Sequence, residues 1–260
     1  MQQANPRIAS VFATQQRWLL AHVALAYYFR GATPDRGGGL HTAKFTDAVA
    51  ADGVASRNTA DAFLKEMEKY GYLREAPAGR DRRIRPLEPT PISVQSVSGW
   101  LVTHLNTLDA LDGGARCAAF LAQPQTIALI QPLIADGLLR SNAIRAPGSA
   151  FSLFTWLNEG GIVMDWLIAG LAEVPFGSPR IPSIVASFDD LGDRIKLSRS
   201  HLIRKLRIAE TMGSLGWLGQ RGKSTMWVSA AFAREYYLQQ SVKLAIIDEA
   251  LNVAFASQRD

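Results

Sequence analysis

The chain has 260 residues, of which 48% are hydrophobic and 20% are charged. This length excludes one small module and suits two domains of about 100–150 residues, while the apolar content excludes a disordered chain. The formal net charge of +5 is a mild excess that favours a polyanionic partner, so the position of the basic residues matters more than their sum.

A single cysteine and the lack of a long apolar run bear on where the protein resides. Cys117 alone can form neither an internal disulfide nor a zinc site, which is typical of a reducing cytoplasm. We expect it to be a small buried apolar residue, with a redox sensor as the alternative. Polar side chains interrupt residues 8–29, and residues 160–174 are too short to span a bilayer, so we predict a soluble cytoplasmic protein with no membrane partner.

The first half of the chain predicts a long helix, a short helix, a turn and a third helix. We expect the long helix over residues 18–30 and the short one over 45–52. Ser56 is a candidate N-cap of the third helix, because its hydroxyl can accept a hydrogen bond from a free amide, and Gly71 ends this helix where a left-handed cap favours glycine. Apolar residues at helical spacing predict its buried face: Ala60, Phe63, Leu64 and Met67.

Two short strands and another helix follow. Residues 72–74 and 84–87 are strand-like, and a basic turn at 80–83 separates them. Another long helix is predicted over 93–111. The order of helix, turn, helix, strand, basic hairpin and strand is that of a winged helix.

The second half repeats the first. Residues 198–215 match residues 56–73 without a gap, at an offset of 142 counted from Ser56 to Ser198. Both segments open with Ser-Arg, carry Leu at the ninth position and end in Gly-x-Leu. A short helix is predicted upstream at 188–195, and a second basic turn downstream at 220–224.

Long helices are predicted around both repeats. We expect one over residues 152–173 and one over 232–255, and residues 116–139 look helical with breaks at Pro124 and Pro132.

These elements predict a fold that is mainly α with small β wings, in which tandem winged helix-turn-helix domains are framed by long helices as a pseudo-dimer. We expect a first winged-helix domain with its flanking helices over residues 1–112, a helical linker region over 113–150, and a second such domain over 151–260.

Four motifs of the first repeat carry a family resemblance: S-x-x-T at 56–59, F-L-x-x-M-E-x-x-G-Y-L at 63–73, D-R-R at 81–83 and L-x-x-T at 87–90. On these motifs, residues 18–111 resemble the MarR family of bacterial transcription regulators. The resemblance implies that the helix at 56–70 enters the DNA major groove, that the wing at 78–85 reaches the minor groove, and that terminal helices form a dimer interface. The second repeat lacks the D-x-R and L-x-x-T motifs, so the two halves need not read the same DNA sequence.

Three residues on the first reading helix are candidates for contacts to bases: Arg57, Asn58 and Lys65. They lie opposite the apolar face, and arginine pairs with guanine edges as asparagine does with adenine edges. Asp61 would accept a hydrogen bond from a cytosine amine or orient Arg57. The alternative is an ordinary solvated helix face.

The first wing adds the candidates Arg80, Arg82 and Arg83. Narrow A·T-rich minor grooves attract arginine, which suits Arg82 and Arg83. Asp81 can hold one of them in place by a charge-assisted hydrogen bond.

The second reading helix and wing are more basic. Between Arg194 and Lys223 eight basic residues face one acidic residue, a local excess of seven that is greater than the net charge of the whole chain. Neutralising DNA phosphates is the natural use of such a concentration. The candidates are Lys196, Arg199, Ser200, Arg204, Arg207, Arg221 and Lys223.

No catalytic constellation is visible, so we predict no enzyme activity, no catalytic residue, no metal site and no cofactor. The four histidines are isolated from one another in sequence, and no phosphate loop or dinucleotide fingerprint is present. Aromatic residues near the framing helices are also consistent with a binding site for a small apolar effector, although core packing explains them equally well.

The sequence therefore predicts a sequence-specific regulator that binds double-stranded DNA, either as a monomeric pseudo-dimer or as a homodimer. Joining two modules in one chain raises their effective concentration, so each can bind weakly. Two alternatives stay open: a tandem winged-helix replication initiator of the plasmid or phage type, and a winged-helix protein-interaction module.

Overall fold

The computed structural model describes residues 14–31, 39–77, 85–155, 160–187 and 199–257. These residues are mainly helical and contain two small antiparallel sheets, and the chain divides into two compact units. We call Gln16–Arg145 with Val242–Asp260 the first unit, and Met1–Gln15 with Ala146–Ser241 the second unit. The first unit therefore contains the first sequence repeat, and the second unit contains the second repeat.

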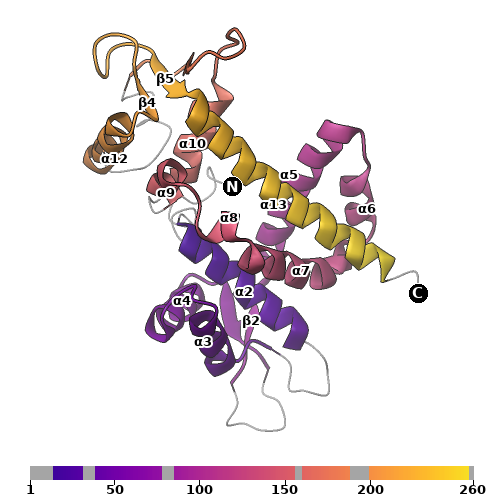
Figure 1. Ribbon diagram of the computed structural model, residues 1–260. Coiled ribbons are helices and arrows are strands. Elements are labelled where there is room, and N and C mark those ends of the chain that lie inside the picture. Colours follow the sequence, from indigo (N-terminus) through magenta and orange to yellow (C-terminus); the bar gives the residue numbers. More distant parts are fainter. Residues whose placement is uncertain (1–13, 32–38, 78–84, 156–159, 188–198, 258–260) are drawn as a thin grey trace. The chain divides into compact units, whose positions relative to one another are not determined.

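The first unit begins with three helices and a small sheet (Figure 1). The elements are α2 (Gln15–Gly31), α3 (Thr42–Ala51), α4 (Arg57–Lys69), β1 (Leu73–Glu75) and β2 (Leu87–Pro89). The strands pair antiparallel with Leu73 opposite Pro89. Leu40 adds a bridge to the other edge of β2, since its amide lies 2.7 Å from the Leu87 carbonyl oxygen.

Helix α4 begins and ends as its sequence predicts. The Ser56 hydroxyl accepts a hydrogen bond from the Thr59 amide at 3.2 Å, which caps a free donor at the helix start. Gly71 has a φ of 75°, a left-handed conformation that favours glycine. The Tyr72 amide bonds the Met67 carbonyl at 2.8 Å, and the predicted apolar face is buried.

The rest of the first unit is helical. It contains α5 (Pro91–Asp112), α6 (Arg116–Ala122), the 3-10 turn η2 (Pro124–Thr126), α7 (Ile127–Arg140) and α8 (Asn142–Arg145). The predicted break at Pro124 is confirmed, but the one at Pro132 is wrong, because Pro132 lies inside α7. A proline there removes one donor to the carbonyl four residues earlier, and burial of the apolar face of α7 outweighs that loss.

The second unit has a similar order of elements. It contains α9 (Ser149–Thr155), α10 (Gly160–Ala169), β3 (Arg180–Pro182), α12 (Arg199–Thr211), β4 (Leu215–Trp217) and β5 (Met226–Ser229), followed by the start of α13 (Ala230–Ala256). The three strands form one antiparallel sheet in the order β3-β5-β4. The predicted helix at 188–195 lies outside the described residues.

The single helix predicted over residues 152–173 is wrong. The structure has α9 ending at Thr155 and α10 ending at Ala169, and Leu171 already forms a β-bridge with Ser183. The chain leaves the helix at Gly170, whose carbonyl accepts from the Ile184 amide at 2.9 Å. A Cβ at Gly170 would lie 2.3 Å from the Ile184 side chain, so glycine permits this close approach.

The end of α12 repeats the end of α4. Gly213 has a φ of 70°, and the Ser214 amide bonds the Ala209 carbonyl at 3.0 Å. These are the positions of Gly71 and of the Tyr72–Met67 bond, shifted by the 142 residues that separate Ser56 from Ser198. The predicted stop of both helices at glycine is therefore confirmed.

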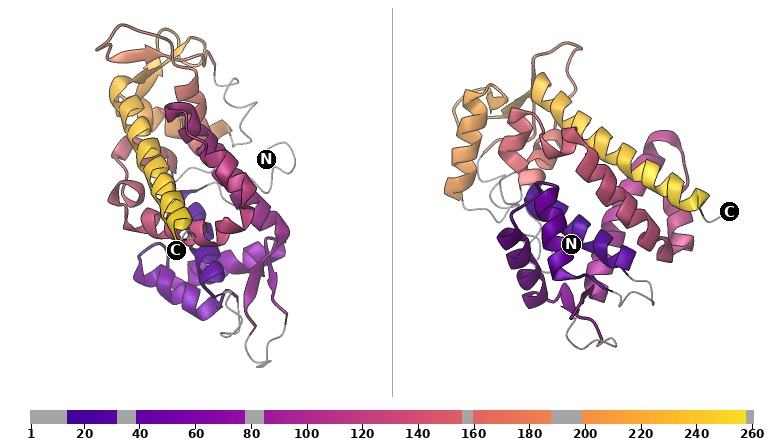
Figure 2. Two further views of the ribbon diagram at one scale, coloured as in Figure 1. Left: turned by 90° about the vertical axis from the view of Figure 1, so that its right-hand side faces the viewer. Right: turned by 60° about the horizontal axis from the view of Figure 1, so that its bottom comes forward.

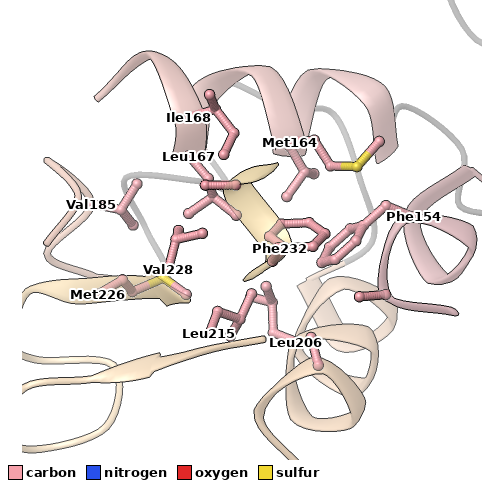
Figure 3. Packing of buried hydrophobic residues seen from close by; sticks show 14 of the residues in the cluster. Phe154, Met164, Leu167, Ile168, Val185, Leu206, Leu215, Met226, Val228 and Phe232 are labelled. Atoms are coloured by element: carbon pink, nitrogen blue, oxygen red, sulfur yellow. The ribbon is translucent and has the colours of Figure 1, made fainter. Parts of the chain in front are cut away.

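Each unit has its own hydrophobic core. Side chains from α9, α10, α12, the strands and α13 converge in the second unit, with Leu167, Leu206, Val228 and Phe232 near the centre (Figure 3). In the first unit, α5, α7 and the last part of α13 form most of the core, with further residues from α2, α6 and α8.

Helix α13 is a single unbroken helix of 27 residues (Figure 2). Its start supplies Phe232 and Ala233 to the core of the second unit, and its end supplies Ile247 and Leu251 to the core of the first. Within the described part of the chain, no single helix is both long enough and apolar enough to cross a membrane.

Candidate nucleic-acid interface

Helix α12 separates apolar and basic side chains onto two faces. Leu202, Leu206 and Ala209 are buried in the core of the second unit, as the sequence predicts. Arg204 and Arg207 lie between these apolar residues in the sequence, and both are exposed. The helical repeat thus fixes one face of α12 by burial and leaves its cations in solvent.

This face carries three cations close together in sequence. Among the described residues, no ion pair involves Arg204, Lys205 or Arg207. Three uncompensated cations within four residues repel one another, which costs stability unless an anion neutralises them. The arrangement is suited to a polyanion.

A short hairpin at 218–225 connects β4 to β5 and follows α12 in the chain. The Leu218 amide bonds the Thr225 carbonyl at 2.9 Å, and the Lys223 amide bonds the Gln220 carbonyl at 3.1 Å. Gly222 has a φ of 75°, which allows the tight turn. Lys223 is exposed and forms no ion pair with the residues that the structure describes, so the hairpin adds one more cation to this region.

Arg221, a predicted phosphate contact, is bonded to α12 in the structure. Its Nε donates to both carboxylate oxygens of Glu210, at 3.1 Å and 2.9 Å. The indole Nε1 of Trp217 donates to Glu210 Oε1 at 2.8 Å. Neither Trp217 nor this use of Glu210 was predicted from the sequence, although Glu210 is the only acidic residue in the basic stretch.

A second aromatic contact on the sheet of the second unit was also missed. The Arg180 guanidinium lies 4.4 Å from the centroid of the Trp227 ring, a cation–π distance. Gly216 pairs with Trp227 across β4 and β5, and a Cβ at Gly216 would lie 2.5 Å from the indole. The signal in the sequence was a glycine in a strand, which often marks a close approach by a neighbour.

The corresponding surface of the first unit is balanced in charge. Arg57 pairs with Asp47 at 2.7 Å, and Lys65 pairs with Asp61 at 2.7 Å. The Asp61 hydrogen bond raises the pKa of Lys65 above its usual value. The expectation that Asp61 orients Arg57 is wrong, because Asp47 of α3 accepts from that guanidinium.

The same balance extends to the first sheet. Arg74 of β1 pairs with Glu88 of β2 at 2.7 Å, and Arg85 pairs with Glu75 at 3.3 Å. Asn58 is exposed on α4. The two repeats thus share their helix ends and strand pairing but differ in electrostatics.

Some predicted contacts cannot be placed. Arg80, Arg82, Arg83 and Lys196 lie outside the described residues. Ser200 is exposed in the first turn of α12, which begins at Arg199.

Two histidines and two tryptophans stack inside the first unit. The rings of Trp18 and His22 are 4.7 Å apart between centroids, those of His22 and Trp100 4.9 Å, and those of Trp100 and His104 4.3 Å. Burial is the main cause that lowers the pKa of His22 to about 3 and that of His104 to about 4, and the nearby charge of Lys243 acts in the same direction on both. The histidines are therefore neutral parts of the packing at neutral pH.

The structure brings few metal-ligating groups together. In the described ranges, no three His, Cys, Asp or Glu side chains form a group that could hold a metal ion. Cys117 is buried and free, as predicted for a small apolar residue.

No family model, curated protein or solved structure matches the chain.

Proposed function

We propose that the chain is a sequence-specific regulator of transcription that binds double-stranded DNA and carries two winged-helix modules as an intramolecular pseudo-dimer. The observation that carries the proposal is the basic face of α12, where Arg204, Lys205 and Arg207 form no ion pair with any residue that the structure describes. Lys223 of the neighbouring hairpin adds to it.

The order of elements supports a winged-helix interpretation of each unit. In the first unit, a helix and the bridge at Leu40 precede two adjacent helices and a strand pair. In the second unit, α10 and β3 precede α12 and the β4–β5 hairpin. A winged helix places the helix before the hairpin in the major groove, and that helix is α12 in the second unit.

Phosphate neutralisation explains why the basic face is uncompensated. Each cation that contacts a phosphate releases counterions, so the affinity falls steeply with salt, by a log–log slope of about 0.9 per contact. An exposed arginine in a surface ion pair gains little from its partner, whereas an unpaired one is available to DNA without breaking any bond.

The test is a salt titration of duplex binding by the full chain. The double variant Arg204→Ala and Arg207→Ala should weaken binding at least tenfold and reduce the salt slope by about two. The matched control is Arg140→Ala with Arg234→Ala, which removes the same charge from exposed positions on α7 and α13. If the two double variants weaken duplex binding equally, the binding is only the non-specific attraction of DNA to a basic protein, and the proposal is overturned.

The first unit has a second candidate function. The charges on its α4 face are balanced by Asp47 and Asp61, which favours a protein-binding surface over a phosphate-binding one. Charge reversal of Arg57 and Lys65 would then leave DNA affinity unchanged. A loss of affinity comparable to that of the α12 variant would assign both units to DNA.

A further inference from the structure

Glu210 joins the hairpin at 218–225 to the helix that carries the basic face. It lies on α12, and its side chain is 22% exposed. Its carboxylate accepts from the Trp217 indole on β4 and twice from the Arg221 guanidinium near the hairpin tip. Charge-assisted bonds of this kind are stronger than neutral ones and stronger again when partly shielded from water.

The hairpin is itself tied into one piece. The Gly219 amide donates to the Ser224 hydroxyl at 3.0 Å, and that hydroxyl donates to the Gln220 carbonyl at 2.9 Å. Because the hairpin is internally bonded, holding Arg221 also limits the position of Lys223. Glu210 therefore fixes the distance between the cation of the hairpin and those of α12.

The same bonds neutralise the charge of Arg221, so less positive charge is available to a polyanion in solution. The Arg221 side chain is 34% exposed and faces a full carboxylate. A paired guanidinium contributes less to indiscriminate phosphate binding than a free one. The contact thus affects both the geometry and the net charge of the interface.

Among the described residues of the first unit, no equivalent contact is present. Glu68 occupies the place of Glu210, 142 residues earlier in the repeat, and no ion pair involves it among the residues that the structure describes. The position of Trp217 is taken by Glu75, which pairs with Arg85 instead. Within the described ranges, a contact between helix and hairpin of this kind is seen in the second unit.

We infer that Glu210 is a positioning residue for selective DNA recognition by the second unit. It holds the hairpin at a fixed place relative to α12 and withholds Arg221 from non-specific phosphate contacts. The inference rests on the proposed DNA binding and adds the element that makes this binding selective.

The test compares Glu210→Gln with the matched control Glu68→Gln in the full chain. Affinities are measured across a salt series for a duplex enriched from a random library and for random-sequence duplex. Glu210→Gln should raise affinity for random duplex, increase the salt slope by about one, and lower the preference for the enriched duplex about tenfold. Glu68→Gln removes the same charge and should leave the preference unchanged.

A second variant breaks the same contact from the other end. Arg221→Gln leaves α12 intact and should also lower the preference for the enriched duplex, but without raising affinity for random duplex. Hydrogen exchange of the amides at 218–225 in the free protein should be faster in both variants and unchanged in Glu68→Gln.

The outcomes separate the two proposals. A wild-type chain that binds no duplex refutes DNA binding as the function. A wild-type chain that selects a duplex while both variants keep its preference, or an unchanged exchange rate in the hairpin, refutes the role of Glu210 alone.

Discussion

The amide nitrogen of Gln131 lies 2.9 Å from Nδ1 of His22 in the core of the first unit. Both side chains are buried, and the amide also donates to the His22 carbonyl at 3.3 Å. An amide N–H can donate only to an unprotonated ring nitrogen, so this contact requires a neutral His22.

Acid should therefore destabilise the fold through His22. The pKa of His22 in the folded state is about 3, below its ordinary value of 6.5, because burial disfavours the charged form. The unfolded chain then binds more protons at any pH between these values, so stability is complete above pH 6.5 and is lost as the pH falls. One such group changes the free energy of unfolding by at most about 1.4 kcal/mol per pH unit.

Urea denaturation at several pH values between 7.5 and 4.5 measures this slope. Replacing His104, whose folded-state pKa is about 4, by glutamine should reduce the slope without removing the His22 contribution. A denaturation midpoint that does not change between pH 7.5 and 4.5 would show that neither histidine is held neutral by burial.

Alanine substitutions at three glycines should change the stability of the protein in different directions, depending on the backbone conformation at each position. Gly71 and Gly213 have positive φ and no atom within 4 Å of an added Cβ, so alanine adds only backbone strain, about 1 kcal/mol. Gly99 has the same open space but lies inside α5 without a positive φ. Alanine there should stabilise the protein by roughly 0.5–1 kcal/mol, and thermal denaturation of the three variants checks the difference.

Local signals in the sequence predicted the elements around α4 and α12. Ser56 and the two glycines determine helix ends through hydrogen bonds within a few residues, so the sequence alone is sufficient to place them. The same glycine stop recurs in the second copy at an offset of 142 residues, because both segments require the same turn.

Long-range packing decided what the sequence did not predict. Pro132 stays in a helix because the core of the first unit buries its neighbours, and residues near 170 leave the helix because Ile184 lies against Gly170. The partners of Arg57, Arg221 and Lys65 likewise depend on side-chain placement. The basic stretch is visible in the sequence, but only three-dimensional contacts show which cations are already paired.

In the stack of Gly216, Trp227 and Arg180, any side chain at position 216 should destabilise the protein. Gly216→Ala places a Cβ 2.5 Å from the indole, which forces Trp227 to move and should cost about 1–3 kcal/mol. The companion change Trp227→Leu removes the ring, so Gly216→Ala should cost less in that background. A double-mutant cycle by chemical denaturation measures the coupling, and simple additivity would contradict the contact.

Arg116 neutralises three carboxylates that come together in the first unit. Its guanidinium lies 2.7 Å from Asp112 and 2.6 Å from Asp248, and its amide donates to Asp109 at 2.9 Å. The pKa of Asp109 is lowered first by the Cys117 amide, and that of Asp112 first by the Arg116 side chain. Both carboxylates thus stabilise the fold when ionised, and this contribution is lost as the pH falls through their lowered folded-state values.

Arg116→Met should therefore destabilise the chain at neutral pH, because three like charges are left together without their cation. The deficit should shrink as acid protonates the carboxylates, so the wild type and the variant should converge in denaturation midpoint towards pH 3. Arg140→Met, at an exposed position of α7, is the control and should differ little from the wild type at either pH. A deficit that is equal at pH 7 and pH 3 would assign the role of Arg116 to packing of its aliphatic stem rather than to its charge.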